Sequence, residues 1–281
     1  MLNSHVFPFV EESLEASDGI DIFCRYKSIT SPDGVVLVIH GFGENQALYE
    51  GYGEMLSQQN LAPYFIDLRG HGKTPGEKGQ LASTEQVLDD LELIVARIET
   101  HFPNKPIIGM GHEVGAVYLA RFVQSNKRKF AGLFLSRIPW HWESTSTQRT
   151  MKPLLRMFGP VASHFLPKHD EMNELSFSMP VPLLDVIEIE ADCLRLVNKA
   201  DEIYCSLFLF CGKLIENKEQ QFFDSVCSFS KEIVTSEAGL NGVELQKQAL
   251  DWFDRVIRAE LAEKRDGAIE TSDDPSLDSW Q

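Results

Sequence analysis

The residues with the clearest chemical spacing are Gly111-His112-Glu113-Val114-Gly115, which follow a short apolar stretch and precede a helical one. Two glycines at this spacing allow a sharp strand-to-helix turn that lifts the central side chain above a sheet. The central residue of such an elbow is usually a serine, which becomes an attacking nucleophile when a histidine accepts its proton. Glu113 is instead an anion with a weakly nucleophilic oxygen. The corner therefore has the spacing of a nucleophile elbow without the usual nucleophile.

Three roles are open to Glu113 on sequence grounds. A carboxylate nucleophile would form an ester whose breakdown needs a histidine to activate water. A general base would need a pKa raised toward neutrality by burial. We favour a third role, in which backbone amides and the positive end of the following helix hold the carboxylate and keep it ionised.

Apolar strands alternate with helices on both sides of this corner. Continuous apolar runs of strand length are typical of strands buried on both faces in a parallel sheet. The following segments read as strands: 34–40, 62–68, 106–110, 131–136, 206–211 and 232–236. A hairpin is predicted around Ser17-Asp18-Gly19, and helices are predicted over 49–59, after Ser83, which forms a capping box with Gln86, and after Asn241. The fold class is therefore α/β, a mostly parallel sheet with helices on both faces.

Residues 138–200 break this rhythm with six prolines, a Ser/Thr run and only short helical patterns. We interpret them as an inserted cap or lid, between a first core part at residues 1–137 and a second at 201–265. The tail at 266–281 is acidic and poor in apolar residues, so we expect disorder. Trp140, His141 and Trp142 open the insertion, where they either line a pocket or pack.

Composition narrows the function classes. The formal net charge of −16 disfavours nucleic acid and anionic membrane surfaces as partners. Five cysteines without metal-type spacing indicate a reducing compartment. The amino-terminal stretch lacks a basic region followed by an apolar one, and no apolar run is long enough to span a bilayer. We therefore expect a cytoplasmic protein without stable membrane insertion, metal site or cofactor.

Three motifs in order, GVVLVIHGFGE, DLRGHGKTPGEKG and GMGHEVGA, carry a family resemblance. The chain resembles the α/β-hydrolases of the monoacylglycerol lipase and lysophospholipase group, also described as the serine aminopeptidase S33 domain, over roughly residues 15–262. The resemblance implies a Ser-Asp-His triad and an oxyanion hole built from the backbone N–H groups of Phe42 and Val114. It also implies that His112, just before the nucleophile position, is a packing residue.

All three triad positions depart from the family pattern. Glu113 replaces the serine, and the position of the acid falls on Ile215, next to Glu216. The family histidine belongs on the loop 237–242, which has none, and no histidine follows His169. An engineered substitution would explain Glu113 but not the simultaneous loss of the other two. Ser136 ends a strand near the corner, but by sequence it has no histidine within reach.

These departures favour a lipase-like homologue that is non-catalytic and binds a small hydrophobic or lipid-like ligand or a protein partner. The alternative is a hydrolase with a rebuilt site that uses Glu113 on an ester such as a monoacylglycerol or lysophospholipid, or on an epoxide or halide. A third possibility is a scaffold whose acidic tail is the contact surface.

Overall fold

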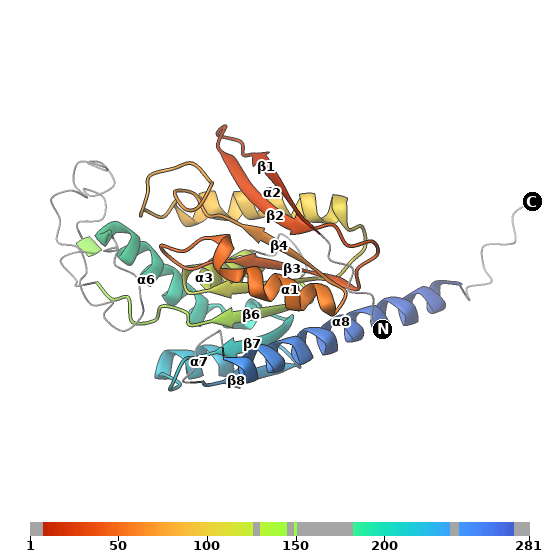
Figure 1. The fold of residues 1–281 in the computed structure, drawn as a ribbon. Helices are drawn as coiled ribbons and strands as arrows, with labels where there is room; N and C mark the ends of the chain where they lie inside the picture. Colours follow the sequence, from red (N-terminus) through yellow and green to blue (C-terminus); the bar gives the residue numbers. More distant parts are fainter. Residues whose placement is uncertain (1–7, 126–129, 145–148, 151–181, 237–241, 273–281) are drawn as a thin grey trace, which may run out of the picture.

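The computed structural model describes residues 8–125, 130–144, 149–150, 182–236 and 242–272. In this part of the chain, eight strands form one sheet in the order β1-β2-β4-β3-β5-β6-β7-β8 (Figure 1). The hairpin of β1 and β2 joins β4 antiparallel, and the neighbours from β4 to β8 all pair in parallel. The strands are β1 Phe9–Glu15, β2 Asp21–Lys27, β3 Gly34–Ile39, β4 Leu61–Ile66, β5 Ile107–His112, β6 Gly132–Ser136, β7 Ser206–Phe210 and β8 Lys231–Val234.

Helices cover both faces of this sheet, as the sequence predicts. The helices are η1 Gln46–Tyr49, α1 Glu50–Gln58, α2 Thr84–His101, α3 Val114–Gln124, α6 Leu183–Asn198, η2 Ala200–Glu202, α7 Asn217–Ser225 and α8 Val243–Ser272. Apolar side chains of α1 and α8 share one core with one face of the sheet, and those of α2, α3, α6 and α7 share the other. Within β3, Val36 and Val38 enter the first core while Leu37 and Ile39 enter the second, because successive strand residues point to opposite faces.

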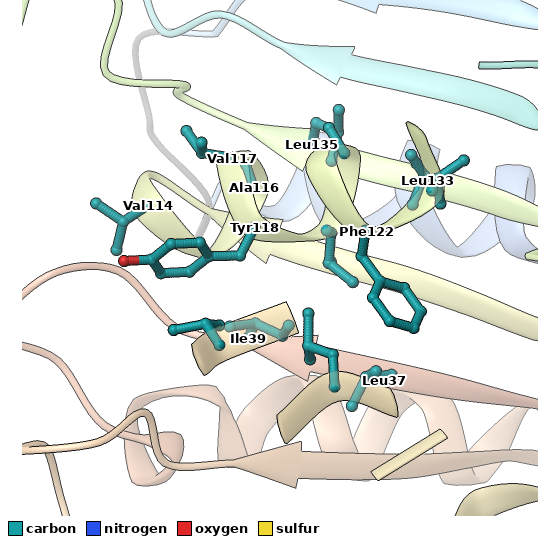
Figure 2. Close-up of a cluster of buried hydrophobic side chains, with 14 of the residues drawn as sticks. Leu37, Ile39, Val114, Ala116, Val117, Tyr118, Phe122, Leu133 and Leu135 are labelled. Atoms are coloured by element: carbon teal, nitrogen blue, oxygen red, sulfur yellow. The ribbon is translucent and has the colours of Figure 1, made fainter. Parts of the chain in front are cut away.

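Helix α3 is the element that fixes the corner before it. Figure 2 shows Tyr118 and Phe122 of α3 beside Leu37 and Ile39 of β3, with Leu135 of β6 nearby. These side chains are at most 1% exposed. Fully burying a large apolar side chain contributes about 1.5–3 kcal/mol, so this contact alone anchors the start of α3 firmly over the sheet.

The predicted domain borders stay predictions, but the structure has more helix near them than the sequence pattern indicated. Residues 138–200 contain a long helix, α6, whose apolar side chains recur at helical spacing and which contacts α3 and α7. Residues 145–148 and 151–181 of the predicted cap lie outside the described residues. The segment expected to be disordered from Asp266 onward begins as helix, because α8 continues to Ser272. No helix in the described part of the chain is both long and apolar enough to cross a membrane.

Candidate functional site

The elbow geometry predicted for the central pentapeptide is present. Glu113 lies between β5 and α3 with φ of 47° and ψ of −115°, a left-handed backbone conformation that a non-glycine residue adopts only where its surroundings impose it. The Glu113 N–H donates to Ser136 O at 2.8 Å, and Glu113 O accepts from Ala116 N at 3.0 Å. The corner is therefore bonded both to the neighbouring strand β6 and to its own helix.

The two flanking glycines are required by close backbone contacts. A Cβ on Gly111 would lie 2.6 Å from the Ala116 backbone, and one on Gly115 would lie 2.5 Å from the Ile39 carbonyl oxygen. Real Cβ atoms do not approach backbone atoms this closely, so any side chain would force the strand and helix apart. The G-x-x-x-G spacing thus sets how closely α3 approaches β3 and β5.

The Glu113 side chain folds back over Gly41, at the end of β3. A Cβ built on Gly41 would meet Glu113 Oε2 at 2.9 Å, Glu44 Oε2 at 3.1 Å and the His112 ring at 3.1 Å. The Phe42 backbone N–H, one of the two predicted oxyanion-hole donors, is close enough to the Glu113 carboxylate to lower its pKa. Glu113 therefore occupies the position where the family resemblance implies an oxyanion would bind.

The electrostatic balance at Glu113 differs from the expectation. The pKa of Glu113 is raised to about 7, by burial first and by the nearby Glu44 carboxylate second, while Arg137 and the Phe42 amide oppose the rise. Glu113 Oε2 is buried with no hydrogen-bond partner in the described structure, and the side chain does not cap α3. The prediction that backbone amides keep this carboxylate ionised is wrong, because only one amide acts on it and desolvation outweighs that amide.

Glu44 is a second buried carboxylate that sequence reasoning missed. Its Oε2 accepts hydrogen bonds from Gly41 N at 2.8 Å and from the Tyr49 hydroxyl at 2.6 Å. Burial raises the pKa of Glu44, and these two hydrogen bonds oppose the rise. The sequence did contain a signal for Glu44, because it lies three residues after Gly41 in the run Gly41-Phe42-Gly43-Glu44. In a tight turn, a polar side chain at this distance can bond back to the backbone at the start of the turn.

The prediction that Ser136 has no histidine within reach is wrong, because the Ser136 hydroxyl lies beside the His112 ring. His112 Nδ1 lies 3.1 Å from Ser136 Oγ, because β5 and β6 pair these two residues directly. On the other side of the ring, His112 Nε2 is 3.9 Å from Glu44 Oε1, which is too long for a hydrogen bond. The three groups have the order of a Ser-His-acid relay, and the strand register that aligns them was not considered at the sequence level.

The surroundings of this relay do not favour proton transfer. The pKa of His112 is lowered to about 3, by burial first and by the positive charge of Arg137 second, so the ring is a weak base and is neutral at neutral pH. The contact with Glu44 is therefore no ion pair. Ser136 is fully buried, with an exposed fraction of 0%. These features agree with a packing role for His112, which stays a prediction.

The remaining predicted triad positions hold no catalytic group. Ile215 is a partly exposed apolar residue, and the Glu216 side chain accepts the N–H of the third residue of α7 in a capping box. Residues 237–241 lie outside the described part, including Asn241. The other histidines of the glycine-rich turns are bonded to backbone, with His40 Nε2 accepting from Leu68 N at 3.0 Å. Among the described residues, no group of His, Cys, Asp and Glu is arranged to hold a metal ion.

The opening of the predicted cap forms part of a hollow. Trp140 and His141, with residues of the loop after β7, line a hollow of about 600 Å³ that does not include Glu113. Trp142 instead is buried and packs edge-on against Phe42, with ring centres 6.1 Å apart. The two alternatives for this segment, pocket and packing, are thus divided between its residues.

Comparisons with known proteins agree with the fold. The sequence model of the family described as serine aminopeptidase S33 matches residues 30–200. A monoglyceride lipase homolog of Monkeypox virus is 30% identical over 115 residues, covering 41% of this chain and 42% of the relative. The monoglyceride lipase of Rattus norvegicus is 28% identical over 145 residues, covering 50% and 48%. These matches span less than half the length of the two relatives.

Solved structures show the same architecture over most of the chain. A soluble variant of monoglyceride lipase from Saccharomyces cerevisiae has a TM-score of 0.68 at 18% identity, covering 92% of this chain and 97% of that one. Monoacylglycerol lipase from Paleococcus ferrophilus has a TM-score of 0.65 at 17% identity, covering 84% and 98%. Together with the elbow geometry and the family match over more than half of the residues, this shows that the chain belongs to the serine aminopeptidase S33 family of α/β-hydrolases.

Proposed function

We propose that this protein is a non-catalytic member of its lipase-like family that binds a small hydrophobic ligand. The observation that carries the proposal is the Glu113 side chain, which lies over Gly41 and takes the Phe42 amide that would otherwise stabilise an oxyanion. Acyl transfer at an elbow also needs a base near the nucleophile, and the chain has no histidine after His169. A protein partner in place of the small ligand is the second form of the proposal.

One alternative is hydrolysis through Ser136, which the 3.1 Å contact with His112 Nδ1 favours. It would require the covered hydroxyl to become accessible and the imidazole to act as a base despite its low pKa. The other alternative is a covalent ester on Glu113, which is supported only by the position of that residue at the elbow. Both alternatives predict a covalent adduct on a named residue.

A labelling experiment separates the non-catalytic proposal from hydrolysis through Ser136 and from a covalent ester on Glu113. The full chain is treated with a fluorophosphonate and with epoxide and haloalkane electrophiles, and intact mass and peptide mapping are read after each. We expect no adduct and no turnover of 4-nitrophenyl esters, monoacylglycerols or lysophospholipids. An adduct on Ser136 that is lost in Ser136→Ala, or turnover that is lost in Glu113→Ala, would overturn the non-catalytic proposal. Native mass spectrometry of the purified protein then identifies a retained small molecule.

The proposal also includes a reducing, cytoplasmic location. The five cysteines are all free, and three of them, Cys24, Cys193 and Cys211, are buried. Burial raises the pKa of each of these thiols, so they behave as small apolar residues. Fractionation of cells expressing the untagged chain tests the location, and recovery in a secreted fraction would contradict it.

A further inference from the structure

Arg137 occupies on β6 the place that Glu113 occupies on β5. Each is the first residue after its strand and has a left-handed backbone, with φ of 51° for Arg137 and 47° for Glu113. Each also donates its N–H to the next strand at 2.8 Å, Arg137 to Phe210 O and Glu113 to Ser136 O. Strained non-glycine residues gather at functional sites, and ligands of doubly wound folds bind outside the carboxyl ends of the strands. Arg137 is therefore placed where a ligand would bind.

The Arg137 guanidinium is an accessible cation without a partner. Among the arginines of the described residues, only Arg137 and Arg265 have no ion pair, and Arg265 is exposed on α8. Arg137 is half-buried, and its side-chain nitrogens have no acceptor in the described structure but remain in contact with solvent. A guanidinium can hold a carboxylate through two parallel N–H groups, so this side chain is free to receive one.

The Arg137 side chain borders open space at the start of the loop after β7. A Cβ built on Gly212 would have Arg137 Nε at 3.9 Å as its one neighbour within 4 Å among the described residues, apart from those next to it in the chain. The guanidinium stem therefore lies over Gly212 without being enclosed by other side chains there. Lys213, the next residue of this loop, is exposed and adds a second positive charge.

The same loop offers an apolar surface beside these two cations. Leu214 and Ile215 follow Lys213 directly and are 79% and 41% exposed. Ile215 also lines the hollow of about 600 Å³ that Trp140 borders. Adjacent apolar side chains next to a hollow are typical of binding sites rather than of an ordinary polar surface. Positive charge and apolar surface thus meet on one loop.

The surrounding carboxylates limit the negative charge that a ligand can carry. Burial raises the pKa of both Glu113 and Glu219, and Arg137 is near enough to both to oppose that rise. A doubly charged phosphate would be repelled by these groups and by the net charge of −16, whereas a single carboxylate matches one guanidinium. We propose that Arg137 binds the carboxylate of a monocarboxylate ligand whose apolar chain lies along Leu214 and Ile215.

This inference rests on the proposed function and deepens it, because it names the class of ligand that the binding protein takes. The test is isothermal titration calorimetry of the full chain with three compounds that share one apolar chain. Octanoate carries a single carboxylate, octanamide is neutral, and octyl phosphate carries more negative charge. We expect saturable binding of octanoate and binding of the other two that is weaker by about tenfold or more, the value of hydrogen bonds between charged groups.

Three variants provide the matched comparison. Arg137→Gln removes the charge but keeps a polar side chain, and should weaken octanoate binding by about tenfold while leaving octanamide binding unchanged. Arg137→Gly should have the same effect and guards against misfolding, because glycine adopts a φ of 51° without strain. Arg265→Gln removes the other unpaired guanidinium, with the same change in net charge, and should bind octanoate as the wild type does.

Several results would overturn the inference. They are the absence of saturable octanoate binding to the wild type, equal affinity for octanoate and octanamide, tighter binding of octyl phosphate, and an equal loss in the Arg137 and Arg265 variants. Ester turnover, in contrast, would refute the non-catalytic role without bearing on the affinity for octanoate, so the two failures are distinguishable.

Discussion

Replacing Glu113 by Gln should stabilise the protein above neutral pH and change little in acid. The amide has the shape of the protonated carboxyl group but cannot ionise. Glu113 is 7% exposed, and its pKa in the folded protein is raised from 4.5 to about 7, mainly by burial and secondarily by Glu44. The variant therefore removes the burial of a charge without removing the side chain.

The sign and size follow from proton linkage. Because the folded state holds the proton more tightly than the unfolded state, its stabilisation is complete below about pH 4.5 and is lost as the pH rises to about 7. The difference between 4.5 and about 7, at about 1.4 kcal/mol per pKa unit, corresponds to about 3 kcal/mol. Glu113→Gln should regain most of this at pH 8 and almost none at pH 4.

Urea unfolding followed by tryptophan fluorescence at pH 4, 6 and 8 measures the effect. With a slope of about 3 kcal/mol per M for a chain of this size, the midpoint of Glu113→Gln should exceed that of the wild type by about 1 M at pH 8. Glu263→Gln, on an exposed part of α8, is the control for removing one negative charge from an acidic protein. Its midpoint should change little and in the same way at each pH.

A destabilised Glu113→Gln at pH 8 would refute this reasoning. That result would mean that the carboxylate is ionised in the folded protein and that its bonds to backbone amides are stronger than its desolvation. The oxyanion-hole donors would then act on Glu113 as the sequence alone suggested. A stabilisation that is equal at pH 4 and pH 8 would exclude ionisation as its cause.

Three further outcomes test other parts of the structure. Gly115→Ala should lower the free energy of unfolding by about 2–3 kcal/mol, because the added Cβ would meet the Ile39 carbonyl. Gly51→Ala, in an open part of α1, should raise it by up to about 1 kcal/mol. Urea unfolding measures both changes. Arg69→Leu should lose about 3 kcal/mol, since it leaves Asp90 buried without the guanidinium that bonds both its oxygens at 2.7 Å. Glu113→Ser should show no hydrolysis of 4-nitrophenyl acetate above the wild type, because His112 is the neighbouring imidazole and burial keeps it a weak base.

The sheet and the helices over 49–59 and 84–101 were predictable because each had an uninterrupted local signal. The apolar run at 34–39 is β3, and the Ser83 and Gln86 capping box starts α2. Helix α6 was missed because it follows a proline-rich stretch and carries buried acidic residues on its inward side. Asp185 accepts from Leu81 N at 2.9 Å and Asp192 from Arg121 Nε at 3.2 Å, so tertiary partners rather than periodicity explain those acids.

At the candidate site, the backbone was predictable and the electrostatics were not. The glycine spacing predicted the elbow because it is a recognised local pattern, although only the Gly111 contact with Ala116 is local and Gly115 meets Ile39 of the distant strand β3. The contact between His112 and Ser136 depends on the register of β5 and β6, and the approach of Glu44 to Glu113 depends on how the β3 turn folds back. Both are long-range placements, and the pKa of Glu113 follows from them.

The elbow is retained in this chain although its central residue cannot act as the usual nucleophile, and the contacts of the corner explain why. Gly111 and Gly115 allow α3 to touch β3 and β5, and the Glu113 N–H closes the ladder to Ser136 on β6. Relaxing the positive φ of Glu113 would break this bond and move the most buried helix of the described fold. The strained corner thus supports the core independently of catalysis. A G-x-x-x-G corner in this family is therefore evidence for the fold, and evidence for activity must come from the residue at its tip and the base beside it.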